Sequence, residues 1–368
     1  MLDTRPISAD SHIVEPPNCY IDYIDPAFRE RAPVIVEVPD GGGDRFKVEG
    51  MPNLIPLNTI AAAGKRPEDI RVEGDKFDAL HRGGWDPKVR LADQDRDGIA
   101  AEFIYPTIGM LLCTLDDAEY KQACMWAYNR WLQEFCGAAP DRLYGLGQTA
   151  VRSVPETIED IRRMKEMGFK GVMLPGRPAT EEDYDSPVFD PLWKAAIELD
   201  MPISFHILTA GKDFGWGTRG PSLNGFAAII RGCQDIIGMF ILSGVFDRHP
   251  NLKLVCVEAD AGWAPHYCYR MDHAYKRHRF WTKSIELQRM PSDYFRENVW
   301  LTFQDDWVAF QNVNQVNPQR LLWANDFPHS DSTWPWSQEI LAEQTKHLTQ
   351  QQADWILRDN VRELYKLN

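Results

Sequence analysis

The chain has 368 residues, of which 44% are hydrophobic and 26% charged, enough for two average domains or one large α/β barrel. Its formal net charge of −14 argues against binding to nucleic acid or to an anionic membrane surface. No apolar run approaches the roughly 20 residues of a membrane span, and the N-terminal residues lack a signal-peptide pattern, so we expect a cytoplasmic protein. No Cys-x-x-Cys pair occurs, so we expect its thiols to be reduced.

Apolar, β-branched runs that are typical of buried strands alternate along the chain with segments of helical periodicity. Strands are expected at residues 7–12, 99–107, 143–151, 171–174, 202–207, 252–258, 299–303 and 321–326. Helices are expected at 116–139, 155–167, 190–199 and 224–246, and Ser153 and Gly168 mark the start and the stop of the second helix. Eight alternating strands and helices predict one closed (β/α)₈ TIM barrel domain that covers residues 1–368.

One long segment interrupts this alternation. Residues 21–85 are rich in Pro and Gly and show no clear periodicity. We expect them to form an insertion after the first strand, with a small hairpin around residues 41–43. Residues 336–367 are expected to form helices that close the barrel.

Polar residues stand at the ends of several apolar strands, where a buried strand would otherwise stay apolar. In a (β/α)₈ barrel the carboxyl ends of all the strands meet at one face, and neighbours at i and i+2 of a strand point to the same side. Histidine and carboxylate ligands without a thiolate suit Zn, Mn or Fe, with one ion expected and two as an alternative. The predicted ligands are Asp10, His12, His206, Glu258 and Asp326.

Residues near other strand ends are candidates for binding a substrate. Arg177 and Arg219 would hold a carboxylate, or else are surface arginines, and Trp216 would cover a ligand ring or pack its own loop. His266 and His273 follow the sixth strand on a predicted helix, where a structural role is the more common one.

With these residues in view, the chain resembles the amidohydrolase-related branch of the amidohydrolase superfamily. The resemblance spans almost the whole chain through "DSHIVEPP", "GGWDPKVRLADQDRDGIAAEFIYPT", "GVFDRHPNLKLV", "EADAGWAPHYCYRMDHAYK" and "WANDFPHSDSTWP". That branch contains metal-dependent barrels such as aminocarboxymuconate semialdehyde decarboxylase and the γ-resorcylate-type decarboxylases. The resemblance implies that Asp10, His12, His206 and Asp326 are metal ligands, and that the protein is a homo-oligomer, a dimer or a tetramer.

The sequence departs from the family pattern at two positions. Many relatives have a histidine where this chain has Glu258, and some decarboxylases have a further glutamate where this chain has Ala261. Glu258 would act as an acid/base or as a ligand of a second metal ion.

Two chemistries fit these residues. The favoured one is a metal-dependent decarboxylase of a small aromatic or unsaturated carboxylic acid, in which Asp326 or His329 protonates the carbon that loses CO₂. The alternative is a hydrolase of an ester, thioester or amide that uses a metal-activated water, with Glu258 or His329 protonating the leaving group. His329 would serve as an acid/base or would simply brace Asp326, and a binding protein without catalysis would leave the cluster free of metal.

Overall fold

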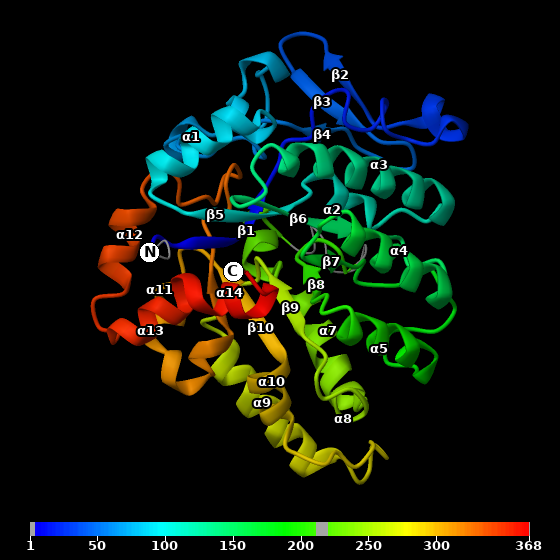
Figure 1. Cartoon of the computed structure of the whole chain (residues 1–368), viewed down its shortest axis with the longest axis vertical. Helices are drawn as coiled ribbons and strands as arrows, with labels where there is room; N and C mark the ends of the chain where they lie inside the picture. The colour runs from blue at the N-terminus through cyan, green and yellow to red at the C-terminus, as the bar shows by residue number, and fades with distance from the viewer. Residues whose placement is uncertain (1–3, 211–219, 368) are drawn as a thin grey trace.

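The computed structural model describes residues 4–210 and 220–367. Eight parallel strands form its central sheet, in which each strand lies beside the next one along the chain (Figure 1). The Asp326 amide donates to the Asp10 carbonyl at 3.1 Å and the His12 amide donates to the Phe327 carbonyl at 2.6 Å, and these bonds close the sheet into the predicted barrel. The barrel strands are β1 (Ile7–His12), β5 (Ala101–Tyr105), β6 (Leu143–Gln148), β7 (Gly171–Met173), β8 (Ile203–His206), β9 (Leu254–Val257), β10 (Val299–Phe303) and β11 (Leu321–Trp323).

Helices surround this barrel, as the alternating pattern predicts (Figure 1). The Ser153 hydroxyl accepts a bond from the Glu156 amide at the start of α4, and Gly168 takes a φ of +91° after its end, as expected from the capping residues. The helices are α1 (Pro87–Asp97), α2 (Ile108–Leu112), α3 (Ala118–Gly137), α4 (Val154–Glu166), α5 (Asp190–Glu198), α6 (Leu223–Ala228), α7 (Arg231–Leu242), α8 (Val245–Arg248), α9 (Ala264–His278), α10 (Pro291–Asn298), α11 (Trp307–Gln311), α12 (Ser337–Gln344), α13 (Gln350–Asp354) and α14 (Asn360–Tyr365).

The single helix predicted at 224–246 is wrong, because the segment forms α6, α7 and α8 instead. Gly244 takes a left-handed φ of +74° before α8, which a continuous helix does not allow. Leu223–Leu242 is long and apolar enough, by length and composition alone, to cross a membrane, contrary to the expectation of no such run. However, the buried Phe240 of α7 packs on Phe205 of β8 with ring centroids 5.6 Å apart, so this face of α7 belongs to the core of the barrel.

The insertion after β1 carries a small antiparallel sheet made of β2 (Val34–Val38), β3 (Gly43–Lys47) and β4 (Ile55–Pro56). Its first hairpin turns where the sequence predicts, with Gly41 and Gly43 at positive φ. The Ala63 amide donates to the Pro328 carbonyl at 3.0 Å, so the insertion is attached to the loop that follows β11.

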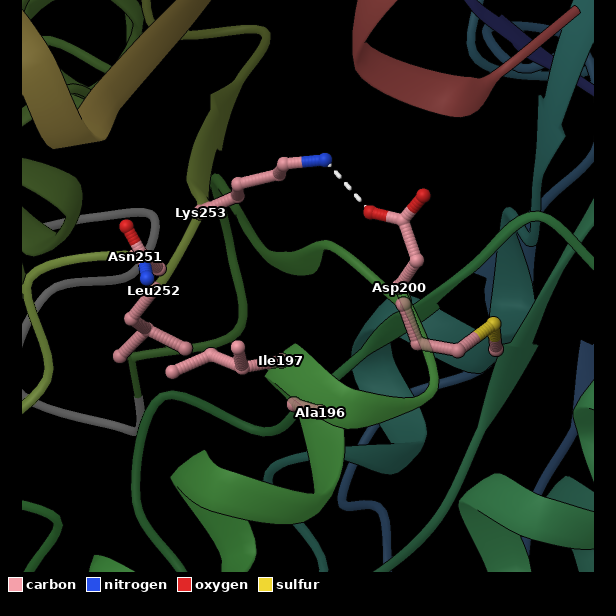
Figure 2. A pocket seen from close by; sticks show the side chains of 7 residues that line it. Ala196, Ile197, Asp200, Asn251, Leu252 and Lys253 are labelled. Carbon is pink, nitrogen blue, oxygen red and sulfur yellow. Dashed lines mark hydrogen bonds and ion pairs between the residues drawn. The ribbon is translucent and has the colours of Figure 1, made fainter.

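The opposite end of the barrel, at the start of β8 and β9, is held by an ion pair (Figure 2). Lys253 Nζ lies 2.6 Å from Asp200 Oδ1 and 3.4 Å from the Leu364 carbonyl, so that α14 is attached to this end. The C-terminal helices therefore close the barrel as expected. A cavity of about 20 Å³ beside this pair has room only for a solvent molecule, and this end of a (β/α)₈ barrel serves stability.

Candidate metal centre

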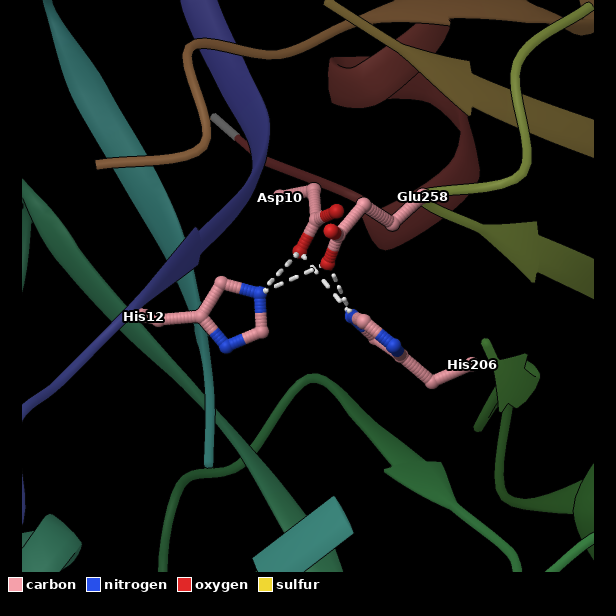
Figure 3. A group of neighbouring side chains, drawn as sticks. All are labelled: Asp10, His12, His206 and Glu258. Atoms are coloured by element: carbon pink, nitrogen blue, oxygen red, sulfur yellow. Dashed lines mark ion pairs between the residues drawn. The ribbon is translucent and has the colours of Figure 1, made fainter. Parts of the chain in front are cut away.

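The site begins at the end of β1, where Asp10 and His12 point to the same side of the strand, as the i, i+2 spacing predicts (Figure 3). His12 Nε2 lies 3.4 Å from Asp10 Oδ1. Ser11 faces the other way and donates to Asn325 Oδ1 at 2.8 Å. Because side chains alternate between the two faces of β1, this strand directs Asp10 and His12 to the centre and Ser11 to a structural hydrogen bond.

Side chains from three other strands converge on the same point. His206 at the end of β8 and Glu258 just after β9 meet with Nε2 and Oε2 3.3 Å apart, and Glu258 Oε2 also lies 3.4 Å from His12 Nε2. Asp326, three residues after β11, places Oδ1 3.5 Å from His12 Nε2. Figure 3 shows four of these side chains directed at one centre, and Asp326 lies in a second group with His329 that shares His12 and Glu258 with the first.

The polar atoms that face this centre have no hydrogen-bond partner in the described part of the chain. They are both carboxylate oxygens of Asp10 and of Asp326, Nε2 of His12 and of His206, and Oε2 of Glu258. Burying several carboxylate oxygens together without a partner is costly. A divalent cation would bind these lone pairs and neutralise the charge, so the residues present fit a metal ion, and nitrogen and oxygen donors suit Zn, Mn or Fe.

Both histidines of the cluster are held in the tautomer that a metal requires. His12 Nδ1 lies 3.0 Å from the Pro106 carbonyl, and His206 Nδ1 lies 3.1 Å from the Ile207 carbonyl. A carbonyl only accepts hydrogen bonds, so each Nδ1 donates its proton and each Nε2 presents a lone pair to the centre.

Burial and mutual charge shift the acid–base properties of the cluster. Burial raises the pKa of Asp326 well above its usual range, and the nearby Glu258 carboxylate adds to this effect. Burial also opposes ionisation of Asp10, but the adjacent imidazoles of His12 and His206 outweigh it and lower the Asp10 pKa. For His12, burial opposes protonation, whereas the adjacent carboxylates of Asp10 and Glu258 raise its pKa well above the usual value. A cation and protons would compete for these groups.

Two of the carboxylates are placed by strained backbone. Glu258 and Asp326 have φ values of +56° and +51°, in the left-handed region that non-glycine residues rarely adopt. Thr302 Oγ1 accepts a bond from the Glu258 amide at 2.8 Å and so holds the turn after β9. Such strain costs about 1 kcal/mol or more at each position and is common at functional sites.

His329 enters the site next to the predicted ligands. Its Nδ1 lies 3.2 Å from Asp326 Oδ1, and its ring stacks on His12 with centroids 3.9 Å apart. Burial lowers the pKa of His329 well below the usual value, and the neighbouring His12 contributes to the shift. This geometry is compatible with either a bracing or an acid/base role.

The three predicted substrate-binding residues are not part of the metal-ligating cluster that the structure describes. Arg177 follows β7 at the same end of the barrel as the cluster, and its side chain is exposed. Trp216 and Arg219 fall outside the described residues. Their roles therefore stay predictions.

Two histidines on α9, whose role the sequence did not decide, face away from the metal-ligating cluster. His266 is exposed and His273 is partly buried, and Tyr269 packs between them with ring centroids 6.2 and 5.9 Å away. Neither belongs to the metal-ligating groups found among the described residues. Ala261, at the second departure from the family pattern, is buried, and its amide donates to Asp306 Oδ2 at 2.8 Å.

Sequence reasoning missed two residues beside the cluster. Thr107 follows β5 and places Oγ1 2.9 Å from His329 Nε2. Tyr105, at the end of β5, bonds to Ser204 Oγ at 2.9 Å, and its ring centroid lies 5.4 Å from that of His206. The rule that located the ligands, a polar group at the end of an apolar strand, applies to β5 as well and could have found both.

The fold and the site together define a class of protein, the (β/α)₈ barrels with a cluster of metal-ligating side chains at the carboxyl ends of their strands. The family model described as Amidohydrolase matches residues 77–367. The chain therefore belongs to the amidohydrolase family, as its motifs suggest.

Comparison with individual proteins gives more distant similarities. The chain is 26% identical over 229 residues to gamma-resorcylate decarboxylase of Rhodococcus jostii, a match that covers 54% of this chain and 64% of that protein. Its structure is similar, with a TM-score of 0.76 and 22% identity, to an amidohydrolase from Mycobacterium avium subsp. paratuberculosis, over 99% and 100% of the two chains. It is also similar to a dihydroxybenzoic acid decarboxylase from Polaromonas with bound manganese and 2-nitroresorcinol, with a TM-score of 0.64 and 18% identity over 99% and 97%.

Proposed function

We propose that the protein is a metal-dependent decarboxylase, a C–C lyase that acts on a small aromatic or unsaturated carboxylic acid. One observation carries the proposal: five ligand-type side chains converge with their inward atoms unpartnered, in a chain that is similar to a gamma-resorcylate decarboxylase. The same observation argues against a binding protein without catalysis, because a cluster of this kind is built for a cation.

In this proposal Asp10, His12, His206, Glu258 and Asp326 hold one divalent ion, which is Zn, Mn or Fe. The manganese bound to the Polaromonas enzyme supports Mn as one of these candidates. When bound, the ion supplies positive charge that attracts the substrate carboxylate and stabilises the negative charge that develops during the reaction.

The chain's own residues would bind the substrate and move one proton. Arg177 or Arg219 pairs with the carboxylate, and Trp216 covers the ring. The bond between the ring carbon and the carboxylate breaks, CO₂ leaves, and a proton from Asp326 or His329 replaces it on that carbon. The buried position of both groups keeps bulk water away from this proton.

Metal analysis and a substrate screen test this function. Protein purified without chelator is expected to contain close to one equivalent of Zn, Mn or Fe, and to release CO₂ from at least one member of a panel of hydroxybenzoates. Less than about a tenth of an equivalent of metal would contradict the assignment of the site.

The specific argument for a hydrolase is Glu258, a third carboxylate where many relatives have a histidine. A hydrolase is expected to contain nearly two equivalents of metal and to cleave thioesters, esters or amides in the same screen while leaving hydroxybenzoates intact. The pattern of substrates thus distinguishes the two activities.

We also propose a cytoplasmic homo-oligomer, a dimer or a tetramer, that has no nucleic-acid or membrane partner. All seven cysteines are free and buried, as suits a reducing compartment. Tyr269 on α9 and Phe280 and Trp281 just after it are exposed by more than half, and a second copy of the chain would cover such apolar side chains. Light scattering is expected to give a multiple of 42.3 kDa, and the double substitution F280E/W281E should reduce it toward one chain.

A further inference from the structure

The buried carboxylate of Asp306 joins the loops that follow β9 and β10. Its Oδ2 accepts hydrogen bonds from the backbone amides of Ala261 (2.8 Å) and Gly262 (2.7 Å). Its Oδ1 accepts one from the amide of Ala309 (2.9 Å) at the start of α11. Both oxygens therefore receive backbone donors, which asparagine could not match because its side chain has a single acceptor oxygen.

The segment that Asp306 holds, residues 258–262, begins at Glu258. The backbone pairing of β9 with β10 ends before this segment. The Glu258 amide instead donates to Oγ1 of the fully buried Thr302 at 2.8 Å. Side chains of β10 and of its loop thus hold the segment at both ends.

The backbone of this segment would not keep its shape without such support. Glu258 and Asp260 have φ values of +56° and +55°, and non-glycine residues keep such values only where their surroundings hold them. At Gly262 a Cβ would lie 2.7 Å from Val308 Cβ and 2.9 Å from Asp306 Oδ1. Only glycine therefore allows the loop to approach Asp306 this closely.

The direction of the Glu258 side chain depends on this backbone. Its Oε2 lies 3.4 Å from His12 Nε2 and 3.3 Å from His206 Nε2. We propose that Asp306 is a positioning residue, which fixes the turn after β9 and so directs the Glu258 carboxylate at the metal centre. This inference rests on the proposed function, because it takes Glu258 as a ligand of the metal ion.

The first test measures metal binding and needs no substrate. Protein treated with a chelator is titrated with Mn²⁺, and the free ion is quantified by electron paramagnetic resonance. Asp306→Asn has one acceptor oxygen where the structure uses two, so the Kd for Mn²⁺ is expected to rise by about 10-fold or more. An unchanged Kd would overturn the proposal. A wild type that binds no Mn²⁺ would contradict the proposed function itself, and this inference with it.

Asp117→Asn is the matched control, because the Asp117 carboxylate also accepts a bond from an amide at the start of a helix, that of Tyr120 at 3.0 Å. Asp117 lies outside the metal-ligating groups found among the described residues. Its substitution should leave the Kd within about 2-fold of the wild-type value. An equal rise in this control and in Asp306→Asn would contradict the role. Asp306→Ser, which keeps an acceptor for the start of α11, replaces Asp306→Asn if that variant does not fold, with the same rise in Kd expected.

The second test separates the positioning of Glu258 from a general structural role. Asp306→Asn is introduced into Glu258→Ala, which has no carboxylate left to position, and the Kd for Mn²⁺ is measured again. In this background the substitution is expected to change the Kd by less than about 2-fold. A rise as large as in the wild-type background would show that Asp306 acts on the fold as a whole and would overturn the proposal.

Discussion

His206 and Asp326 are the two cluster residues whose removal separates binding of the metal from movement of the proton. His206→Ala removes one of the proposed nitrogen ligands and is expected to lower metal affinity by at least about 100-fold, with a comparable loss of turnover. Asp326→Asn leaves an oxygen ligand but no ionisable group, so kcat is expected to fall by about 10²- to 10⁴-fold. Metal analysis, steady-state kinetics and circular dichroism check these outcomes. Near-normal turnover in either folded variant would mean that the site is assigned wrongly.

Glu15 predicts a distinct dependence of stability on pH. Burial raises its pKa to about 7, although backbone amides that donate to it, among them those of Ile108, Gly109 and Thr107, oppose the shift. The folded state therefore keeps this proton up to neutral pH, whereas the unfolded chain releases it near 4.5. The stability that Glu15 contributes is present at low pH and is lost as pH rises toward 7, by about 3 kcal/mol in total.

The substitution Glu15→Gln tests this, because glutamine does not titrate. The free energy of unfolding of both proteins is measured with urea at pH 5 and at pH 8. The value for the variant minus the value for the wild type is expected to be about 2–3 kcal/mol larger at pH 8 than at pH 5. Glu68→Gln, at an exposed residue, is the control and should change the difference by less than about 0.5 kcal/mol. A parallel pH profile for Glu15→Gln and the wild type would show that Glu15 is ionised throughout.

The sequence predicted the cluster residues because a charged or imidazole side chain at the end of an apolar run is anomalous by itself. Asp10 and His206 lie in their strands as expected, whereas the strand expected at 321–326 ends at Trp323 and leaves Asp326 three residues beyond it. The partner of His329 could not be predicted, since its contact with Thr107 depends on how the loops after β5 and β11 fold toward each other. Spacing along the chain contains no information about such contacts.

Among the elements, α1 has a central role because Arg90 connects it to the strand ends beneath the metal centre. The fully buried guanidinium donates to the carbonyls of His12 (2.8 Å), Gly83 (3.2 Å) and Phe327 (3.3 Å), and it pairs with Glu102 of β5. These bonds hold the backbone on both sides of the barrel closure.

Arg90→Met is therefore expected to lower the free energy of unfolding by about 3–5 kcal/mol, because Glu102 is left buried without its partner. The double variant Arg90→Met/Glu102→Leu should regain part of this loss, which a double-mutant cycle in urea would measure. Arg66→Ala, in the exposed pair with Asp69, is the control with an expected effect below about 1 kcal/mol. Equal effects at the two arginines would contradict the structural role of Arg90.

The eight barrel strands were predictable because each is a short apolar run with polar flanks. α1 was missing from the expected helices, although Asp86 and Pro87 mark its start and Gly98 its end, because its surface is too polar to show an apolar stripe. The three-helix segment was misjudged for the opposite reason. Its apolar periodicity continues across Gly244, and only the backbone conformation of that residue interrupts the helix.

At the level of the whole molecule, the metal would join strands from both ends of the chain, since β1, β8, β9 and β11 all contribute to its site. Binding to the folded state alone stabilises it by about 3 kcal/mol when the free metal is at 100 times its Kd. Treatment with a chelator is therefore expected to lower Tm by several degrees, and addition of Mn or Zn to restore it. His206→Ala should show a much smaller change, whereas an unaltered Tm in the wild type would contradict a shared metal.

The left-handed backbone at Glu258 and Asp326 has an evolutionary consequence. Glycine or asparagine would relax these turns, and fewer crowded carboxylates would make the barrel easier to fold. Variants selected only for thermal stability should consequently replace one of these two acids early, and should gain stability while they lose activity. The loss of either acid would therefore identify a homologue that no longer catalyses the reaction.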